Sequence, residues 1–326
     1  MKKILVTGGS GFLGSSLIQE LIKGPKKIVV FDNNFRGSFK KFKYQANKVT
    51  LFKGDIRKSS DISKAIKDCD EVYHLAFING TKNFYESPEL VLDVGINGIL
   101  NVLKIIREKK IKKFLFASSS EVYHKPKKFP GQENEHLVIP NPQNPRFSYS
   151  SSKIIGEVLT LNYLRNTKIK HFIFRPHNIF GPQMGFEHVI PEILKKIYLA
   201  SNKFKKKRCV IKIQGNGSET RSFCFIDDAA KQIIRINKKG KNKEIYNVGQ
   251  TFEISILKLI KDISKIIGIK IKVKPGKLTR GSVLRRCPDI KKIKKLGKND
   301  NNYYFGLRKT INWYKNFYIK KHRWKI

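Results

Sequence analysis

The sequence predicts an α/β protein built on a doubly wound parallel sheet with a smaller second lobe. In the first half of the chain, short β-branched or aromatic segments alternate with helical stretches, and parallel strands need such long crossovers between them. A glycine-rich turn directly follows the first of these segments. Because ligands of such folds bind beyond the carboxyl ends of the strands, we expect the functional site at that edge.

The elements follow in order from the hydrophobic periodicity. The predicted strands are Lys3–Thr7, Lys27–Phe31, Val49–Phe52, Val72–Leu75, Phe114–Ala117 and His171–Arg175. The predicted helices are Phe12–Lys23, Ile62–Asp68, Pro88–Lys109 and Tyr149–Arg165. We assign residues 1–175 to the sheet domain and residues 176–326 mainly to the smaller lobe, because glycine and proline interrupt the pattern from there on. Whether part of the second half returns to the sheet stays open.

Composition excludes several classes of protein. The chain has 326 residues, of which 68 are Lys or Arg and 25 are Asp or Glu, so its net charge is +43. A hydrophobic content of 40% argues for a folded core despite that charge. The basic residues are spread along the chain without zinc-finger spacing, an RNP-like segment or heptads, so we expect no specific nucleic-acid partner.

The remaining residue classes indicate location and metal content. No apolar run approaches the roughly 20 residues that cross a membrane, so we expect no membrane association and a cytoplasmic protein. The four cysteines are far apart and include no Cys-x-x-Cys pair, which predicts neither a disulfide framework nor a metal site.

The glycine-rich turn Thr7-Gly8-Gly9-Ser10-Gly11-Phe12-Leu13-Gly14 has the pattern of a dinucleotide-binding site. Its glycines allow a tight turn and a close approach of the backbone to a pyrophosphate, and the following helix directs N–H groups at the phosphates. We expect the cofactor to contact Gly8, Gly11, Phe12, Leu13 and Gly14. Asp32 and Asn33 end the second strand, where a carboxylate binds ribose hydroxyls and repels a 2′-phosphate, so the predicted cofactor is NAD.

A tyrosine and a lysine one helical turn apart, Tyr149 and Lys153, are the candidate proton-transfer pair. The Tyr-x-x-x-Lys spacing also occurs at Tyr44 and Tyr123, so position rather than spacing selects Tyr149. It opens the helix after the fifth strand, which ends in Ser118-Ser119-Ser120-Glu121. A cation beside a phenol lowers its pKa, which predicts that Lys153 makes Tyr149 a proton acceptor.

These motifs together resemble the extended short-chain dehydrogenase/reductases that modify nucleotide sugars, a Rossmann-fold family of NAD-dependent epimerases and dehydratases. The matching segments are Thr7–Gly14, Gly54–Ile56, Tyr73–Ala76, Ser118–Tyr123, Tyr149–Lys153, Arg175–Pro182, Arg221–Asp228, Tyr246–Gly249 and Arg285–Asp289. The resemblance covers nearly the whole chain. It implies a nucleotide-diphosphate sugar as substrate and a homodimer as the assembly.

The resemblance also implies roles for further residues. Asp55 and Ile56 would lie near adenine, Leu75 and Ala76 near the centre of the cofactor, and Lys153 on the nicotinamide ribose. Ser119 falls at the catalytic serine or threonine position. The implied substrate contacts are Ser119, Ser120, Asn178, Arg221 and Arg286, where the arginines suit a diphosphate.

Three reactions share the implied first step, the oxidation of the sugar at C4 to a ketone. A 4-epimerase returns the hydride to the other face, a 4,6-dehydratase removes the C5 proton and the C6 oxygen, and a UDP-glucuronate decarboxylase releases CO₂. We predict a 4-epimerase first, because epimerases are common in this family. Glu121 matches the other two, where a glutamate precedes Val-Tyr. A noncatalytic NAD-binding or RNA-binding protein on the same fold is the alternative from another class, and the Ser119, Tyr149 and Lys153 set argues against it.

Overall fold

The computed structural model describes residues 2–278 and 283–323. Within them, seven parallel strands form a central sheet in the order β11-β6-β5-β4-β1-β2-β3. The strands of this sheet are β1 (Lys2–Thr7), β2 (Lys26–Asp32), β3 (Val49–Lys53), β4 (Glu71–His74), β5 (Lys113–Ala117), β6 (Lys170–Pro176) and β11 (Ile245–Val248). Each of the six strands expected from the sequence is confirmed to within one residue at either end. The strand order reverses next to β1, so the glycine-rich turn lies at the switch point.

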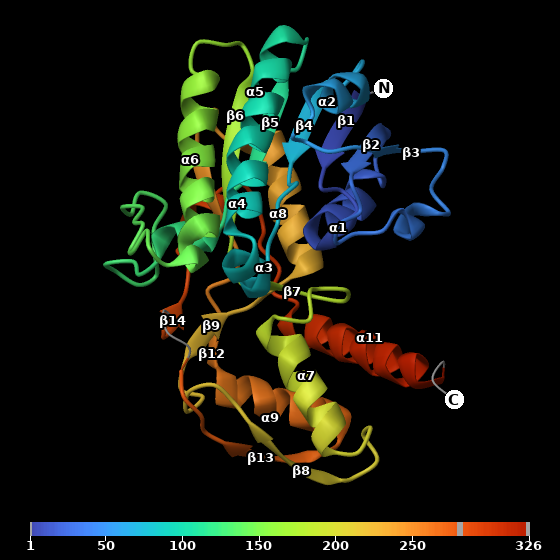
Figure 1. The fold of residues 1–326 in the computed structure, drawn as a ribbon, viewed down its shortest axis with the longest axis vertical. Helices are drawn as coiled ribbons and strands as arrows, with labels where there is room; N and C mark the ends of the chain where they lie inside the picture. Colours follow the sequence, from blue (N-terminus) through green and yellow to red (C-terminus); the bar gives the residue numbers. More distant parts are fainter. Residues whose placement is uncertain (1, 279–282, 324–326) are drawn as a thin grey trace.

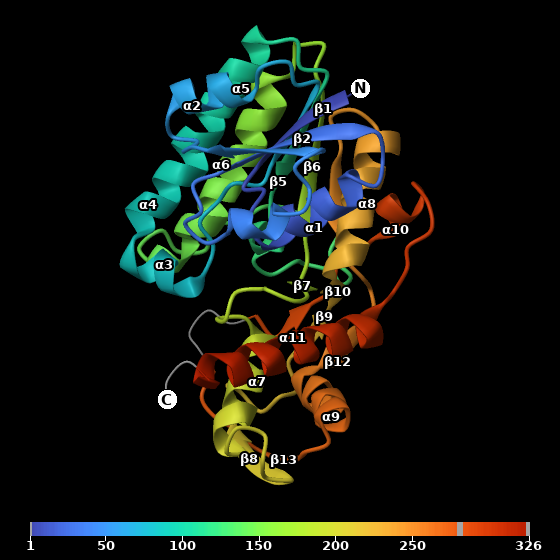
Figure 2. The ribbon, with the colours of Figure 1, turned by 90° about the vertical axis from the view of Figure 1, so that its right-hand side faces the viewer.

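Helices cover both faces of the sheet, as Figures 1 and 2 show. One face carries α2 (Ser59–Ala65), α4 (Pro88–Leu92), α5 (Gly98–Glu108) and α6 (Ser148–Tyr163). The other carries α1 (Phe12–Leu21), α8 (Ile226–Lys239) and α10 (Lys291–Lys294). Strands such as β1 are buried from both sides, as a doubly wound sheet requires. The second half of the chain therefore supplies both a strand, β11, and two helices to this sheet.

Two predicted helices differ from the sequence-based expectation. The helix expected at Ile62–Asp68 begins three residues earlier and ends at Ala65, because the backbone at Asp68 turns to a positive φ of 59°. The helix expected at Pro88–Lys109 is interrupted between α4 and α5 by a π-helical turn, Asp93–Asn97. Such turns are frequent at functional sites, and Val94 of this one lines the main cavity.

The second lobe lies below the carboxyl ends of the strands in both views (Figures 1 and 2). Its helices are α7 (Val189–Ala200), α9 (Ile256–Ile267) and α11 (Tyr303–Arg323), and α3 (Thr81–Glu86) of the sheet domain faces it. Its strands pair as β8 (Arg208–Lys212) with β13 (Lys270–Lys274), β7 (Ile179–Phe180) with β10 (Cys224–Phe225), and β9 (Thr220–Ser222) with both β12 (Glu253–Ser255) and β14 (Arg285–Arg286). Apolar residues of the three helices form a separate core.

Candidate active site

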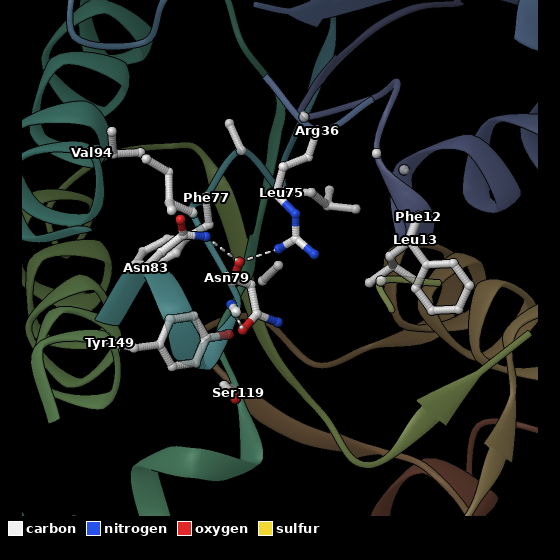
Figure 3. A pocket seen from close by; sticks show the side chains of 18 of the residues that line it. Phe12, Leu13, Arg36, Leu75, Phe77, Asn79, Asn83, Val94, Ser119 and Tyr149 are labelled. Carbon is white, nitrogen blue, oxygen red and sulfur yellow. Dashed lines mark hydrogen bonds between the residues drawn. The ribbon is translucent and has the colours of Figure 1, made fainter. Parts of the chain in front are cut away.

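A cavity of about 960 Å³ lies between the carboxyl ends of the sheet strands and the second lobe. Residues at or just beyond the ends of β1, β2, β3, β4, β5 and β6 all line it. It brings together every residue that we expected to bind the cofactor, together with Ser119, Ser120, Glu121, Asn178 and Arg286. Figure 3 shows part of this lining, with Tyr149 and Ser119 at one end and Phe12 and Leu13 at the other.

The glycine-rich turn leaves no space for side chains. Gly8 has a φ of +69°, and a Cβ there would lie 2.6 Å from the backbone nitrogen of Ala76. A Cβ on Gly14 would lie 2.4 Å from the carbonyl oxygen of Gly8. Glycine at both positions therefore lets β1, β4 and α1 approach one another, and it keeps the backbone exposed to the cavity. This arrangement fits the pyrophosphate of a dinucleotide at the start of α1.

Asp32 ends β2 with its carboxylate held in place by the backbone. One oxygen accepts the Ser10 N–H at 3.0 Å and the other accepts the Asn34 N–H at 2.8 Å. Each oxygen keeps a lone pair for a ribose hydroxyl. Lys41 lies close by, with its Nζ 2.9 Å from the Ser10 carbonyl. Burial lowers the pKa of Lys41, and the Asp32 carboxylate opposes that shift.

Tyr149 lies at the first turn of α6, packed edge-on against Phe77 and stacked on Phe84 at centroid distances of 5.0 and 4.9 Å. Burial raises the pKa of its phenol to about 12, although a hydrogen bond with Ser119 and the charge of Arg36 act in the opposite direction. The phenol and the Ser119 hydroxyl are therefore neighbours, as a shared contact with one substrate oxygen would require.

The Lys153 ammonium lies near the Tyr149 ring, and the expectation that it lowers the pKa of the phenol stays a prediction. The Lys153 ammonium donates to the carbonyl of Ala117 at 2.6 Å and lies 3.8 Å from the centre of the Phe77 ring. It lies 5.9 Å from the centre of the Tyr149 ring. Burial lowers the pKa of Lys153 itself to about 7, against the opposing effect of Glu157.

Glu121 follows Ser119 and Ser120 in a short 3₁₀ turn, Ser120–Tyr123, and forms an ion pair with Arg286 of β14. Burial alone would raise the pKa of Glu121, but Arg286, with Arg146 and Arg221 further away, holds it below its ordinary value. Glu121 is thus an ionised carboxylate in the same cavity as Tyr149, where it raises the pKa of the phenol.

The two remaining expected substrate contacts differ in their placement. Asn178 lines the cavity with a positive φ of 41°, and its amide donates to the Ser222 carbonyl at 3.3 Å. Arg221 lies outside the lining, where its guanidinium donates to the carbonyls of Thr220 and Val283, both at 2.7 Å. Burial and the nearby Arg286 lower the pKa of Arg221 to about 10.

Sequence reasoning missed one side of the cavity. Arg36, four residues beyond Asp32, reaches across to the Asn79 carbonyl, as Figure 3 shows. Asn79, Asn83 and Phe84 come from the connection after β4, and Arg146 comes from the turn before α6. In the sequence these residues are marked only by their position after the end of a strand. Polar loop residues without a function also occur at such positions, so this signal does not identify them.

The described part of the chain gives no sign of a metal centre: it contains no group of three or more His, Cys, Asp or Glu side chains placed to hold an ion. Nor does any of its helices have the length and apolar character needed to cross a bilayer.

The model of the NAD dependent epimerase/dehydratase family matches residues 4–249 of this sequence. The chain belongs to this family. It is 33% identical over 96% of its length to a putative UDP-glucose 4-epimerase from Methanocaldococcus jannaschii, covering 98% of that protein. It is also 30% identical over 96% of its length to a UDP-N-acetyl-α-D-glucosaminuronate decarboxylase from Bacillus cytotoxicus, covering 98% of that protein.

The fold agrees with this membership. The UDP-glucuronic acid 4-epimerase from Bacillus cereus, solved with UDP-glucuronic acid and NAD, superposes with a TM-score of 0.83 and 27% identity over 97% of this chain and 100% of its own. The Rossmann-like architecture and the expectation of an NAD-dependent enzyme are confirmed. The relatives carry out different reactions on nucleotide sugars, so membership alone does not distinguish epimerase, dehydratase and decarboxylase.

Proposed function

We propose that this enzyme oxidises C4 of a nucleotide-diphosphate sugar and then acts at C5 and C6 of the resulting ketone, as a decarboxylase of a nucleotide-linked uronic acid. Bound NAD⁺ would accept the hydride from C4. Tyr149 takes the proton of the C4 hydroxyl, while Ser119 hydrogen-bonds to the same oxygen. Their position at the same end of the cavity supports this pairing of roles.

Lys153 and Asp32 would contact the two ends of the cofactor. Lys153 lines the cavity beside Phe77, where its ammonium suits the hydroxyls of the nicotinamide ribose. Asp32 suits the adenosine ribose, because both its oxygens are oriented by backbone N–H groups. We place Gly8, Gly11, Phe12, Leu13, Gly14, Leu75 and Ala76 between these ends.

The observation that carries the choice of reaction is the Glu121 and Arg286 pair. A 4-epimerase needs no charged group at this position, because it touches no proton at C5. Arg286 has five N–H donors and directs one guanidinium nitrogen at Glu121, which leaves donors for a substrate carboxylate or phosphate. Arg146 lines the same cavity. A carboxylate at C6 would be held there, and a ketone at C4 makes it a β-keto acid. Loss of CO₂ would leave its electron pair in an enolate, which takes a proton at C5 before the hydride returns to C4.

A 4,6-dehydratase fits less well. Elimination requires an acid that protonates the leaving C6 hydroxyl. The residue next to Glu121 in the cavity is Ser120, and the hydroxyl of a serine is a poor acid. The sequence-based prediction of a 4-epimerase is the second candidate, because Ser119, Tyr149 and Lys153 are sufficient for that reaction.

Product analysis in D₂O distinguishes these reactions. We expect UDP-glucuronic acid to release CO₂ and to give a pentose carrying solvent deuterium at C5, detected by NMR. Glu121→Gln should slow this reaction at least tenfold, whereas Ser120→Ala, its neighbour in the same turn, should change the rate only slightly. A product uronic acid or hexose without solvent deuterium would show that the enzyme is a 4-epimerase.

We further propose that the enzyme is a homodimer, joined through α5 and α6. These adjacent helices carry apolar side chains that are only partly covered, Leu100 and Ile155, and Val158 is 54% exposed. Light scattering coupled to gel filtration should give twice the chain mass of 37.7 kDa, and Val158→Glu should convert the dimer to monomers. A monomeric wild-type protein contradicts the proposal.

We also propose that the two parts of the chain bind different molecules. Residues 1–175, together with β11 and α8, would hold the cofactor and the catalytic side chains. The remainder of residues 176–326 would hold the nucleotide of the substrate, with Asn178, Arg221 and Arg286 nearest to its diphosphate.

A further inference from the structure

A second cavity lies at the opposite end of the sheet from the candidate active site. It is a groove of about 630 Å³ between the loop that joins α5 to β5 and the loop that joins α6 to β6. Figure 1 shows these segments at the end of the sheet domain that is remote from the second lobe. We call it the basal groove. Its cationic lining residues are Arg107, Lys109, Lys110, Lys112, Lys113, Lys168 and Lys170.

These cations have few carboxylate partners. The described residues that line the basal groove include no Asp or Glu. Of its seven cations, only Lys112 forms an ion pair within the part of the chain that the structure describes, with Asp70 at 2.7 Å. Glu108, the last residue of α5, is exposed and lies outside the lining. The groove therefore concentrates positive charge that the described chain leaves mostly uncompensated.

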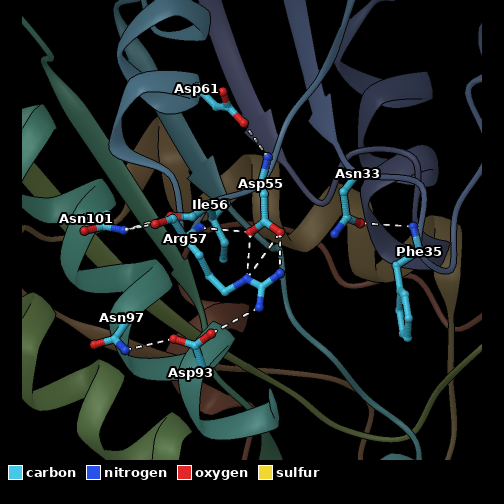
Figure 4. Close-up of polar contacts among 9 residues, drawn as sticks. All are labelled: Asn33, Phe35, Asp55, Ile56, Arg57, Asp61, Asp93, Asn97 and Asn101. Carbon is cyan, nitrogen blue, oxygen red and sulfur yellow. Dashed lines mark hydrogen bonds and ion pairs between the residues drawn. The ribbon is translucent and has the colours of Figure 1, made fainter.

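A cation of the main cavity shows the contrasting case. Arg57, in the loop after β3, lies between the carboxylates of Asp55 and Asp93, as Figure 4 shows. The two distances are 2.7 and 3.1 Å. Arg57 thus joins two walls of the protein and has its counter-charges within the chain. The cations of the basal groove connect no such walls, so a structural role of this kind does not account for them.

The sheet itself brings the two basic loops together. β5 and β6 pair in parallel with Lys113 opposite Lys170. The backbone N–H of Lys170 donates to the carbonyl of Lys112 at 3.0 Å, and the N–H of Lys112 donates to the carbonyl of Asp70 at 2.8 Å. The backbone positions of these lysines are therefore fixed by the strand pairing, with or without a ligand.

This convergence of like charges is unfavourable at its centre. Lys113 is half-buried, and its ammonium donates to the carbonyl of Asn237 at 2.6 Å. Burial lowers the pKa of Lys113, Glu71 opposes that shift, and the charges of Lys2 and Lys170 add to the lowering. A bound anion would offset this repulsion, because an opposite charge favours the protonated form of a lysine.

The side chains of the groove indicate which anion fits. Six of the cations are exposed, and the buried lining residues are Ile111 and Ile169. Among the described residues, no aromatic side chain lines the groove, whereas proteins that bind single-stranded nucleic acid stack its bases on aromatic residues. Both isoleucines are buried, so neither offers an apolar contact to a bilayer. The lining thus favours a narrow chain of phosphates without bases or acyl groups.

We propose that the basal groove binds a linear inorganic polyphosphate chain. Ammonium and guanidinium groups donate charge-assisted hydrogen bonds to phosphate oxygens, and the two loops present them on both sides of the groove. This binding is a function separate from the nucleotide-sugar reaction. It depends on no residue of the main cavity.

Calorimetric titration of the full-length protein with long-chain sodium polyphosphate tests the inference. We expect saturable binding at an ionic strength of about 0.15 M that weakens as salt is added. A groove variant in which Lys109, Lys110, Lys168 and Lys170 are replaced by Gln should bind at least about tenfold more weakly, because four modest ion pairs are lost together. Replacing the same four lysines by Arg should keep the affinity within about threefold.

The matched control removes the same charge elsewhere. Lys212 of β8 and Lys270, Lys272 and Lys274 of β13 are exposed at the far end of the second lobe (Figure 1). Replacing these four by Gln should change the affinity by less than about twofold. Circular dichroism verifies that each variant is folded. Saturating NAD and UDP should leave the affinity of the wild type unchanged, because the basal groove and the main cavity lie at opposite ends of the sheet.

Several results would overturn the inference. Absence of binding by the wild type refutes it directly. An equal loss in the two Gln variants would mean that net charge alone attracts polyphosphate, and an Arg variant as weak as the groove variant would exclude a site based on charge. Loss of binding in the presence of NAD and UDP would place polyphosphate in the main cavity.

Two other ligands serve as competitors of different chemistry. A single-stranded RNA with the same number of phosphates should bind more weakly than polyphosphate, and tighter binding of the RNA would make a nucleic acid the occupant. Phosphatidylserine vesicles should not sediment the protein through these lysines. If they sediment the wild type and not the groove variant, the groove faces a membrane and the proposed ligand is wrong.

Discussion

Glu157→Gln removes the negative charge from a buried ion pair that connects α6 to β6. The Glu157 carboxylate accepts Arg175 Nε at 2.8 Å and Nη2 at 2.6 Å, and both side chains are only 2–3% exposed. The Ser118 hydroxyl donates to the same carboxylate at 2.5 Å. Glutamine has nearly the same volume, so the substitution leaves the packing in place and isolates the effect of the charge.

The expected loss follows from the guanidinium that remains. Arg175 also donates to the Tyr123 hydroxyl at 2.7 Å and to the Glu133 carbonyl at 2.9 Å, but neither carries its counter-charge. Leaving a buried cation unpaired costs about 3–5 kcal/mol of the free energy of unfolding. Large single-chain proteins lose about 2–4 °C of melting temperature per kcal/mol, so the melting temperature should fall by roughly 6–20 °C.

Urea unfolding followed by far-UV circular dichroism measures this loss. The matched control is the double variant Glu157→Leu with Arg175→Met, which removes both charges. Replacing a buried pair by apolar residues is often neutral, so the double variant should recover most of the stability lost by the single one. The reasoning is refuted if Glu157→Gln unfolds within about 1 kcal/mol of the wild type, or if the double variant is less stable than the single one.

Three further predictions concern the cavity. Tyr149→Phe should abolish turnover while calorimetric binding of NAD stays within about twofold of the wild type, because only the hydroxyl is removed; turnover at the wild-type rate would exclude Tyr149 as the base. Asp32→Ala should narrow the preference for NAD over NADP measured by calorimetry, because Lys41 then faces a 2′-phosphate without the opposing carboxylate; a wild-type preference for NADP would contradict the role of Asp32. Lys153→Met should abolish activity. Below pH 7 it should also raise the free energy of unfolding by roughly 2–4 kcal/mol, because the wild-type protein buries a charged ammonium whose pKa is lowered from 10.5 to about 7. Above pH 7 the wild-type lysine loses its proton in the folded state, so the gain should shrink towards pH 10.5, and a gain that does not depend on pH would contradict the buried charge.

The local pattern of the sequence was sufficient for the sheet and for the glycine-rich turn. Alternation of short apolar segments with helices depends on neighbours in the chain, so six strands were predicted to within a residue. The turn before α1 was also predictable from the sequence. Glycine is required at Gly8 and Gly14 by the backbone geometry of one loop and its nearest strands. Tyr149 and Lys153 were predicted in the same way, from their position after a strand.

The electrostatics of the cavity were decided by the tertiary structure alone. Glu121 and Arg286 are 165 residues apart in the sequence, and nothing in either segment shows that they meet. Burial raises the pKa of Tyr149 and lowers that of Lys153, although their spacing suggested that the lysine would activate the phenol. The physical reason is that a charge acts through distance and desolvation, and both are set by which segments fold over it. A sequence places ionisable groups in order along the chain, but only the folded chain removes them from water and chooses their partners.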